Sequence, residues 1–563
     1  MYKHKVIYTI NEMSSQWKRK MMFKKNKANI KTKYEPSESY KEMVRNGAYL
    51  GKKGYTIPKS LLEPKDLESL YEDLNVKPIT PGVTYGAPTD EGSFPVYREN
   101  DKKIYIPRFF GIERYGLPNR SEITKGDNIS LEFPKSLRDY QDKIIDVYMK
   151  HVDNPICCGS EQNGNGGILE VPCGRGKTVM ALKIISDIQK KTLIIVHKEF
   201  LMNQWIDRID EFLPGAKVGK IQGPVFDVEG KDIVIGMLQT LYDRALPENA
   251  FDCFGLTIID EVHRIGSEQF SKTLLRVASP NMLGISATVD RKDKLTTVLY
   301  MFIGPKIYTE QRKDEDPVCV RSMEYISSDP EFNETEYDFK GQTKYSTMIS
   351  KLGNFGPRSD FIVKAIQDLI DESREKGEEA QIMVLAHTRS LLKYFYESIS
   401  HKGFASVGYY VGGMKQCDLQ ETEGKQIVLA TYAMAAEALD IKSLSILVMA
   451  TPKTDITQSV GRILRTRHDN PIVVDIVDHH DVFQKQWKQR KTFYRKCNYR
   501  IIGIDSIRYK TMTLDWENDK TWTKLFDPKK WNKKDDDECT GGNPVLKKKC
   551  LISISDLDLN EDS

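Results

Sequence analysis

Residues 168–179 read ILEVPCGRGKTV, and this stretch decides how the first half of the chain is interpreted. An apolar run ends at Pro172, a short loop follows, and the tripeptide GKT at 176–178 opens a segment with helical periodicity. The backbone N–H groups and the helix dipole at such a helix start favour a bound polyphosphate. A lysine at this place reaches the terminal phosphates, and a threonine hydroxyl can bind Mg²⁺. The stretch therefore predicts a phosphate-binding loop, although Val171 stands where the strict pattern has glycine.

Short apolar runs alternate with helix-length segments through most of the chain. From Leu131 to Pro305 the runs are GGILEV, TLIIVH, DIVIGM, LTIIDEV and NMLGISAT. After residue 357 a second series contains AQIMVLAH, KQIVLATY, LSILVMA and PIVVDIVD. Buried strands separated by crossover helices are typical of parallel sheets. The predicted fold class is therefore α/β, with two tandem domains, each a parallel sheet with crossover helices.

Composition separates the remaining segments. The first 40 residues are lysine-rich and predict a basic, partly disordered arm that could contact phosphate backbones. Residues 94–116 alternate around an Asn-Asp-Lys-Lys turn and predict a β-hairpin, hence a small α+β accessory domain. Its interleaved basic and aromatic residues also occur on nucleic-acid surfaces, but ordinary hairpin packing is the better interpretation. The predicted order is an arm at 1–40, an accessory domain at 41–125, α/β domains at 126–310 and 358–505 separated by a connector with an insertion at 311–357, and a polar tail at 506–563.

Length, charge and cysteine usage exclude several classes of protein. The chain has 563 residues, which suits roughly three to four domains. Its net charge of +4 does not by itself indicate nucleic acid, and its nine cysteines contain no CxxC pair. No apolar run approaches the ~20 residues that cross a bilayer, and the N-terminus lacks a secretory signal. We expect an intracellular protein with no membrane partner.

Two adjacent carboxylates, Asp260 and Glu261, directly follow the apolar run LTII. At the end of a parallel strand, one carboxylate can hold Mg²⁺ through water and the other can polarise the water that attacks a phosphoanhydride. Ser286-Ala287-Thr288 follows another strand, and its hydroxyls could bond these carboxylates and the facing domain. The sequence therefore predicts metal-assisted hydrolysis of a nucleotide.

Gln458, Arg462 and Arg465 lie in the second α/β series, at spacings of four and three that share one face of a helix. Two guanidinium groups aimed at one place need an anion between them. A γ-phosphate held by the other domain is such an anion, so these residues are arginine-finger candidates. Hydrolysis would then depend on domain closure, which is how a nucleotide can drive movement along a strand.

The ordered set LRDYQ, VPCGRGKT, VHKEFLMNQW, MLQTL, DEVH, SAT, VLAHTRSLL, ATYAMAAEALD and QSVGRILR resembles a superfamily 2 helicase over residues 131–480. It is similar to the XPB/UvsW branch, whose phosphate loop also opens with an aliphatic residue, as Val171 does here. The segments GYTIPKSLL, PVYRE and IYIPRFFG resemble the N-terminal region of helicases of large nucleocytoplasmic DNA viruses, including the poxvirus transcript-release type.

This resemblance implies two RecA-like domains, with ATP and Mg²⁺ bound in the cleft between them. Asp260 would orient the metal, and Glu261 would be the catalytic base. The matched ATP-site positions are Arg138 and Gln141 for adenine; Cys173, Gly174, Arg175, Gly176, Lys177 and Thr178 for the phosphates and metal; and Lys177, Asp260, Glu261, Gln458, Arg462 and Arg465 for catalysis. The matched nucleic-acid positions are His197, Lys198, Gln239, Thr240, Thr388, Arg389 and Thr431, with Ser286 and Thr288 coupling the domains.

The implied activity is ATP hydrolysis coupled to movement along DNA, 3′ to 5′, in viral transcription, replication or recombination. The expected partners are nucleic acid, contacted through its backbone, and viral transcription machinery, with the chain monomeric and placed in the host cytoplasm or virion. An ATP-dependent RNA helicase of the DEAD-box kind is the alternative, but Val262-His263 replaces Ala-Asp, and Gln458 stands where that branch has His. An inactive nucleic-acid scaffold and a restriction-type translocase subunit fit less well.

One position departs from the helicase pattern. The fifth motif reads Glu437-Ala438-Leu439-Asp440 where glycine is usual at the second place. Alanine is small, so we expect activity to be retained, with altered coupling to movement. The sequence offers no evident pin or wedge for separating strands.

Overall fold

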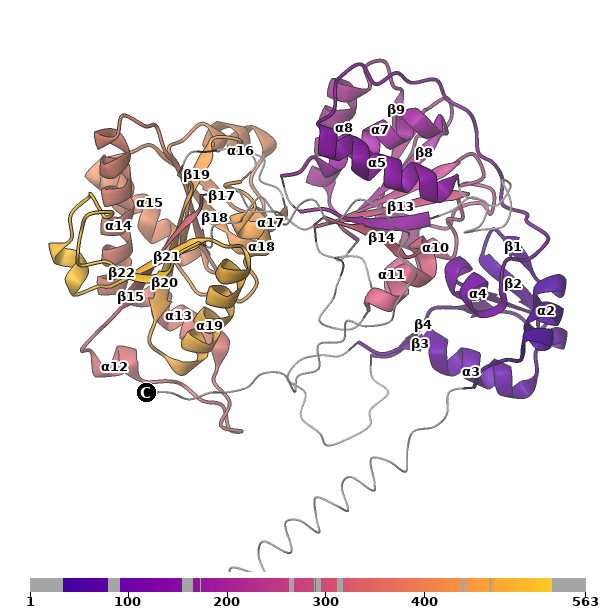
Figure 1. Cartoon of the computed structure of the whole chain (residues 1–563), viewed down its shortest axis with the longest axis horizontal. Coiled ribbons are helices and arrows are strands. Elements are labelled where there is room, and N and C mark those ends of the chain that lie inside the picture. Colours follow the sequence, from indigo (N-terminus) through magenta and orange to yellow (C-terminus); the bar gives the residue numbers. More distant parts are fainter. Residues whose placement is uncertain are drawn as a thin grey trace, which may run out of the picture.

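The computed structural model describes residues 34–78, 92–153, 166–172, 174–262, 268–287, 289, 295–310, 317–437, 441–464, 468 and 470–528. These residues form two eight-stranded sheets, each in its own lobe, and a smaller N-terminal unit beside the first lobe (Figure 1). The predicted fold class, two α/β domains with an N-terminal α+β unit, is confirmed. The basic arm before residue 34 and the tail after residue 528 lie outside the described residues.

The first sheet carries the predicted phosphate loop. Its order is β10-β9-β11-β8-β12-β13-β7-β14, and it is parallel except for the β10–β9 pair. Because the strands are parallel, the residues that follow them meet at one edge. The strands are β7 (Gly166–Glu170), β8 (Thr192–Val196), β9 (Val218–Gln222), β10 (Val225–Phe226), β11 (Ile233–Met237), β12 (Leu256–Asp260), β13 (Asn281–Ser286) and β14 (Lys306–Thr309).

Helices cover both faces of this sheet, because its strands are apolar on both sides. One hydrophobic cluster packs α5 (Asp139–Val152), α7 (Lys177–Ile188) and α8 (Glu199–Phe212) on one face. Another packs α9 (Leu238–Asp243), α10 (Glu268–Leu274) and α11 (Thr296–Ile303) on the opposite face.

The second sheet has the order β17-β18-β16-β19-β20-β15-β21-β22, with only the last pair antiparallel. Its strands are β15 (Cys319–Tyr325), β16 (Gln381–Ala386), β17 (Val407–Tyr410), β18 (Ile427–Thr431), β19 (Leu444–Met449), β20 (Ile472–Asp478), β21 (Arg500–Asp505) and β22 (Thr523–Phe526). Its helices are α12 (Pro330–Asn333), α13 (Tyr345–Asn354), α14 (Gly356–Glu375), α15 (Arg389–Lys402), α16 (Gln416–Glu423), α17 (Tyr432–Glu437), α18 (Thr457–Val460) and α19 (Asp481–Lys496), with a 3₁₀ turn at Arg508–Thr511.

Two predicted boundaries of this domain are corrected by the structure. The strand β15, placed in the connector by the sequence, pairs with β20 and β21 inside the sheet. The strand β22, placed in the polar tail, pairs with β21, and Trp516 and Trp522 join the hydrophobic cluster beside it. The second domain therefore begins before residue 358 and continues beyond residue 505.

The N-terminal unit is built around a four-stranded antiparallel sheet, β1-β2-β6-β5. The predicted hairpin is present as β5 and β6, but the residues after Pro107 form the helix α4 instead of continuing as strand. The bounds are α2 (Glu38–Gly47), β1 (Tyr49–Gly51), β2 (Gly54–Pro58), a 3₁₀ turn (Lys59–Leu61), α3 (Pro64–Leu74), β3 (Asn75–Val76), β4 (Phe94–Pro95), β5 (Arg98–Glu99), β6 (Lys103–Ile106) and α4 (Arg108–Tyr115).

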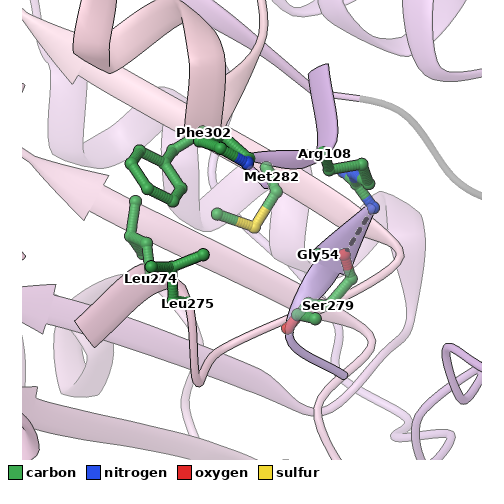
Figure 2. Close-up of a pocket in the computed structure, with 9 residues that line it drawn as sticks. Gly54, Arg108, Leu274, Leu275, Ser279, Met282 and Phe302 are labelled. Atoms are coloured by element: carbon green, nitrogen blue, oxygen red, sulfur yellow. Dashed lines mark hydrogen bonds between the residues drawn. The ribbon is translucent and has the colours of Figure 1, made fainter. Parts of the chain in front are cut away.

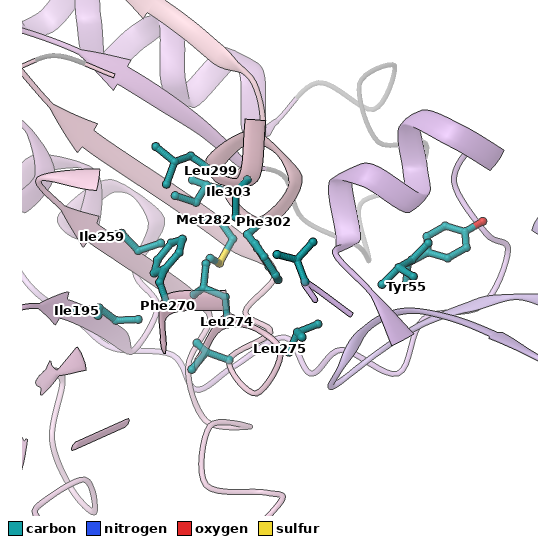
Figure 3. Packing of buried hydrophobic residues seen from close by; sticks show 14 of the residues in the cluster. Tyr55, Ile195, Ile259, Phe270, Leu274, Leu275, Met282, Leu299, Phe302 and Ile303 are labelled. Carbon is teal, nitrogen blue, oxygen red and sulfur yellow. The ribbon is translucent and has the colours of Figure 1, made fainter. Parts of the chain in front are cut away.

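This unit is packed firmly against the first domain. One hydrophobic cluster runs from Tyr55 in β2 to Phe270 and Phe302 of the first domain (Figure 3). Arg108 is 6% exposed. Its Nη1 donates to the carbonyl of Ser279 at 2.9 Å (Figure 2) and to the carbonyl of Pro280 at 3.1 Å. Arg98, Arg108 and the aromatic residues beside them therefore serve packing. This agrees with the interpretation of the segment as ordinary hairpin packing. Among the described residues, no helix is long and apolar enough to cross a membrane.

Candidate nucleotide site

The phosphate loop lies between β7 and α7, where the sequence predicted it. The strand ends at Glu170 and the helix begins at Lys177. Gly174 and Gly176 have φ values of 82° and 78°, in the left-handed region where a side chain is strained. A Cβ at Gly176 would lie 2.4 Å from Gln141 Nε2, so a side chain there would displace the Gln141 amide from its place beside the loop. The loop delivers Lys177 and Thr178 at the first turn of the helix, as phosphate binding requires.

The predicted carboxylates meet the loop lysine at the carboxyl edge of the first sheet. Lys177 Nζ lies 3.9 Å from Glu261 Oε1, and both side chains are largely buried. Asp260 ends β12, where its Oδ1 accepts a hydrogen bond from the Glu261 backbone N–H at 2.9 Å. The structure thus brings Lys177 together with the adjacent Asp260 and Glu261, which lie more than 80 residues further along the sequence.

Asp260 is held in an environment that disfavours its negative charge. Burial, and then the Glu261 carboxylate, raise the pKa of Asp260 from 3.8 to about 6. Trp205 Nε1 donates to Asp260 Oδ2 at 2.9 Å and fixes the orientation of the carboxyl group. A cation beside this group would restore its charged form, so the donor set suits Mg²⁺. Trp205 belongs to the motif VHKEFLMNQW, but the sequence predicted no role for its indole.

The backbone of Glu261 is strained. Its φ is 50°, a left-handed value that is uncommon for any residue other than glycine. Such residues persist where the surrounding structure fixes them, and they cluster at active sites. The turn after β12 therefore supports the interpretation of Glu261 as a reacting group.

A set of contacts braces the loop from the side of α5. Gln141 Nε2 donates to the Arg175 carbonyl at 3.1 Å, and the Tyr140 hydroxyl donates to the same oxygen at 3.3 Å. The Arg175 guanidinium lies 3.8 Å from the centre of the Tyr140 ring and pairs with Glu310. The backbone N–H of Arg138 donates to Gln141 Oε1 at 3.0 Å. Both predicted adenine residues thus stand beside the loop.

Glu170 is a further residue at this site, and no sequence pattern pointed to it. Its carboxylate accepts from the Val289 N–H at 2.8 Å, from Lys306 Nζ at 2.8 Å and from Thr309 Oγ1 at 3.1 Å. Next to it, the Val171 N–H donates to the Ser286 carbonyl at 2.8 Å. The start of the phosphate loop is therefore bonded directly to the segment that contains the Ser-Ala-Thr motif.

The candidate residues of the second domain lie on a shorter helix than the sequence predicted. The helix α18 ends at Val460, and the chain continues in turns with bonds from the N–H of Arg462 to Ser459 O and of Ile463 to Val460 O. Arg462 is 6% exposed. Gln458 is therefore helical and Arg462 is not, which corrects the expectation of one continuous helical face.

The predicted nucleic-acid residues lie at the carboxyl edges of the two sheets. His197 and Lys198 follow β8, and α9, which follows β11, carries Gln239 and Thr240. In the second domain, Thr388 and Arg389 begin α15 after β16, and Thr431 ends β18. These positions are set by the topology of parallel sheets, which turns strand ends to one side.

Several candidate residues lie outside the part of the chain that the structure describes. These are Cys173 of the phosphate loop, His263, Thr288 of the Ser-Ala-Thr motif, Ala438, Leu439 and Asp440 of the fifth motif, and Arg465.

Comparisons with known proteins relate this chain to ATP-dependent helicases and translocases. The family described as "Type III restriction enzyme, res subunit" matches residues 134–291. The chain is 34% identical over 526 residues to "Putative ATP-dependent RNA helicase L396" of Acanthamoeba polyphaga mimivirus, covering 90% of this chain and 98% of that protein. It is 29% identical over 397 residues to "Putative ATP-dependent RNA helicase QP509L" of African swine fever virus, covering 66% and 74%.

More distant similarities reach cellular and phage proteins. The chain is 32% identical over 211 residues to "DNA 3'-5' translocase XPB2" of Sulfurisphaera tokodaii, covering 36% of this chain and 43% of that protein. The crystal structure of T4 UvsW is 19% identical, with a TM-score of 0.31, covering 79% of this chain and 96% of that one.

Proposed function

This chain belongs to the superfamily 2 helicases, in the group that contains the mimivirus relative, and we propose that it hydrolyses ATP to move along a nucleic-acid strand. The observation that carries the proposal is the meeting of Lys177 with Glu261 and Asp260 beside a glycine loop at a helix start. The RecA-like arrangement of two parallel sheets supplies the two halves of an ATP site.

In the proposed reaction, Lys177 and the N–H groups at the start of α7 hold the terminal phosphates of ATP. Thr178, and Asp260 through water, would hold Mg²⁺, which would supply positive charge to neutralise the phosphates. Glu261 accepts a proton from the attacking water, and Lys177 Nζ lies 3.9 Å from its carboxylate. Arg138 and Gln141 contact the adenine.

We propose that the second domain completes this site. Gln458, Arg462 and Arg465 would reach the γ-phosphate when the domains close, and the positive charge of the two arginines would stabilise the transition state. The Ser286 carbonyl accepts a hydrogen bond from the phosphate loop. A change in the loop on ATP binding or hydrolysis would therefore be transmitted through Ser286 to the strand-binding surface.

The strand would run across the carboxyl edges of both sheets, in contact with His197, Lys198, Gln239, Thr240, Thr388, Arg389 and Thr431. The names of the two viral relatives that cover most of the chain support RNA as the first candidate strand. DNA, which the motif residues favoured, is the second candidate, because the similarity to the XPB2 translocase spans 211 residues. The proposed role is in viral transcription, replication or recombination, and the viral origin of the relatives supports only its viral part. Direction along the strand, 3′ to 5′, is part of the DNA proposal only.

The catalytic assignment is tested by removing the two groups that contact the reacting phosphate. We expect Lys177→Ala and Glu261→Gln to lower ATP hydrolysis by about 10²-fold or more, because each removes transition-state stabilisation or the base. Strand binding should be retained, since neither residue lies among the proposed strand contacts. Lys183→Ala, further along the same helix, is the control. A fully active Glu261→Gln variant would contradict the assignment of Glu261 as the catalytic base.

The strand is identified by comparing the stimulation of ATP hydrolysis by single-stranded RNA, single-stranded DNA, duplex DNA and branched DNA. We expect stimulation to fall with added salt, because the proposed contacts are to phosphates. Stimulation by RNA alone would exclude the DNA candidate, and stimulation by DNA alone would exclude the RNA candidate.

A further inference from the structure

A short hairpin projects from the second domain between α12 and α13 (Figure 1). We define the Phe339 hairpin as residues 336–344, in which Tyr337 and Thr343 form an antiparallel bridge. Phe339 at its tip is 94% exposed, and Tyr337 is 56% exposed. Single exposed apolar side chains are common on protein surfaces, but two exposed rings on one short hairpin form an aromatic surface, which suggests a binding role.

The turn that presents this ring is well fixed. The Asp338 carboxylate accepts from the N–H groups of Lys340 and Gln342, both at 2.8 Å. Gly341 has a φ of 73°, and the Asp338 N–H donates to the Gln342 carbonyl at 2.8 Å. The exposure of Phe339 is therefore a property of an ordered turn, and little conformational entropy would be lost when the ring binds.

The base of the hairpin is anchored at the carboxyl edge of the second sheet. The Tyr345 hydroxyl donates to the Pro452 carbonyl at 3.1 Å, and its ring meets the edge of His387 with centroids 6.4 Å apart. Further along α13, a Cβ at Gly353 would lie 3.6 Å from Thr388 Oγ1. The hairpin thus ends at a helix, α13, that packs beside Thr388, one of the residues that are proposed to contact the strand.

The chemistry of the hairpin tip fits a nucleobase better than it fits a nucleic-acid phosphate backbone or an apolar protein surface. Lys340 Nζ lies 5.4 Å from the centre of the Phe339 ring, so an aromatic face and a cation stand together. Bases stack on aromatic side chains with little regard to sequence, and a neighbouring lysine can contact the adjoining phosphate. The ring at the tip, Phe339, suits one base at the end of a duplex.

We propose that the Phe339 hairpin is the pin that separates strands, with Phe339 stacking on the base at the fork. This inference rests on the proposed function, because the motor must draw one strand past the pin. It also supplies the wedge that the sequence did not reveal.

The test compares wild-type chain, Phe339→Ala, Phe339→Trp and Ile507→Ala on forked duplexes of DNA and of RNA. Ile507 is a matched control, since it is 62% exposed in the same domain but outside the hairpin. We expect Phe339→Ala to open about tenfold fewer base pairs per ATP hydrolysed, because an alanine cannot stack. Phe339→Trp should rescue this ratio, and Ile507→Ala should leave it unchanged.

A second readout reports the contact itself. With 2-aminopurine at the fork junction, stacking on Phe339 should quench its fluorescence in wild type and not in Phe339→Ala. Wild-type chain that lacks strand-stimulated ATP hydrolysis would overturn the proposed function and the pin with it. Stimulated hydrolysis with no unwinding, or with equal unwinding by Phe339→Ala, would overturn the pin alone.

Discussion

The Glu170 carboxylate joins three parts of the nucleotide site. It accepts bonds from the Val289 N–H after the Ser-Ala-Thr motif and from Lys306 and Thr309 around β14. Its own residue ends the strand that leads into the phosphate loop. A change in the loop on ATP binding can therefore reach the motif segment through one side chain, so we interpret Glu170 as a positioning residue.

We expect Glu170→Gln to lower the ratio of strand-stimulated to basal ATP hydrolysis by about tenfold. The amide keeps the shape but loses the charge that binds Lys306, and charge-assisted bonds contribute about 1.5–3 kcal/mol. The measurement is the ATPase rate with and without a saturating strand, with kcat and KM determined separately. Glu229→Gln, at an exposed position of the same domain, is the control. An unchanged ratio in Glu170→Gln would mean that the carboxylate only supports the fold.

Asp260 gives the site a dependence on pH. Its pKa is raised to about 6, so in the metal-free protein it is protonated below that pH. The stability that it contributes is fully present below its unfolded pKa of 3.8 and is lost as the pH rises through about 6. Metal binding has the opposite requirement, because only the carboxylate can bind a cation.

Affinity for Mg²⁺ should consequently fall as the pH drops below about 6, by up to about tenfold per pH unit. The measurement is the Mg²⁺ dependence of ATP binding between about pH 5 and pH 7.5 in wild type and Asp260→Asn. The variant should bind Mg²⁺ weakly at every pH, with little slope from this group. The same slope in both chains would assign the titration to another residue.

At the level of secondary structure, the sequence predicted the strands that are apolar on both faces. It missed strands whose polar side chains find their partners on other elements of the fold. The strand β15 reads CVRSMEY, and its arginine breaks the apolar pattern. In the fold, Arg321 is 3% exposed and pairs with Glu372 of α14 at 2.6 Å. That partner is distant in sequence, so the pattern alone could not identify the strand.

The strand β22 was missed for a related reason. It is a short edge strand with two exposed residues, and its position depends on pairing with β21 and on the burial of Trp522. The phosphate loop and the carboxylates were found because each directly follows an uninterrupted apolar strand. Glu170 and the Phe339 hairpin were not found, because their contacts or their exposure arise only once the sheets assemble.

Across the whole molecule, the N-terminal unit and the first domain share one hydrophobic cluster. The buried Arg108 guanidinium bonds two carbonyls in the turn before β13, and Arg98 Nη2 donates to the Lys272 carbonyl at 3.0 Å. These contacts join α4 and β5 to the face of the sheet that lies opposite α7. The unit should therefore move with the first domain in the proposed closure of the two sheets on ATP, instead of acting as a separate module.

This rigid attachment predicts that Arg108→Ala will loosen both sides of the contact together. The variant leaves the Ser279 and Pro280 carbonyls without their buried donor, at a cost of about 2–4 kcal/mol to the joint unfolding free energy. Hydrogen exchange should then accelerate in β2 and β6 and also in β13 and α11, because one cluster holds them. Lys102→Ala, at an exposed turn, should leave exchange unchanged. Faster exchange confined to β2 and β6 would instead mean that the N-terminal unit opens by itself and that the first domain is stable without it.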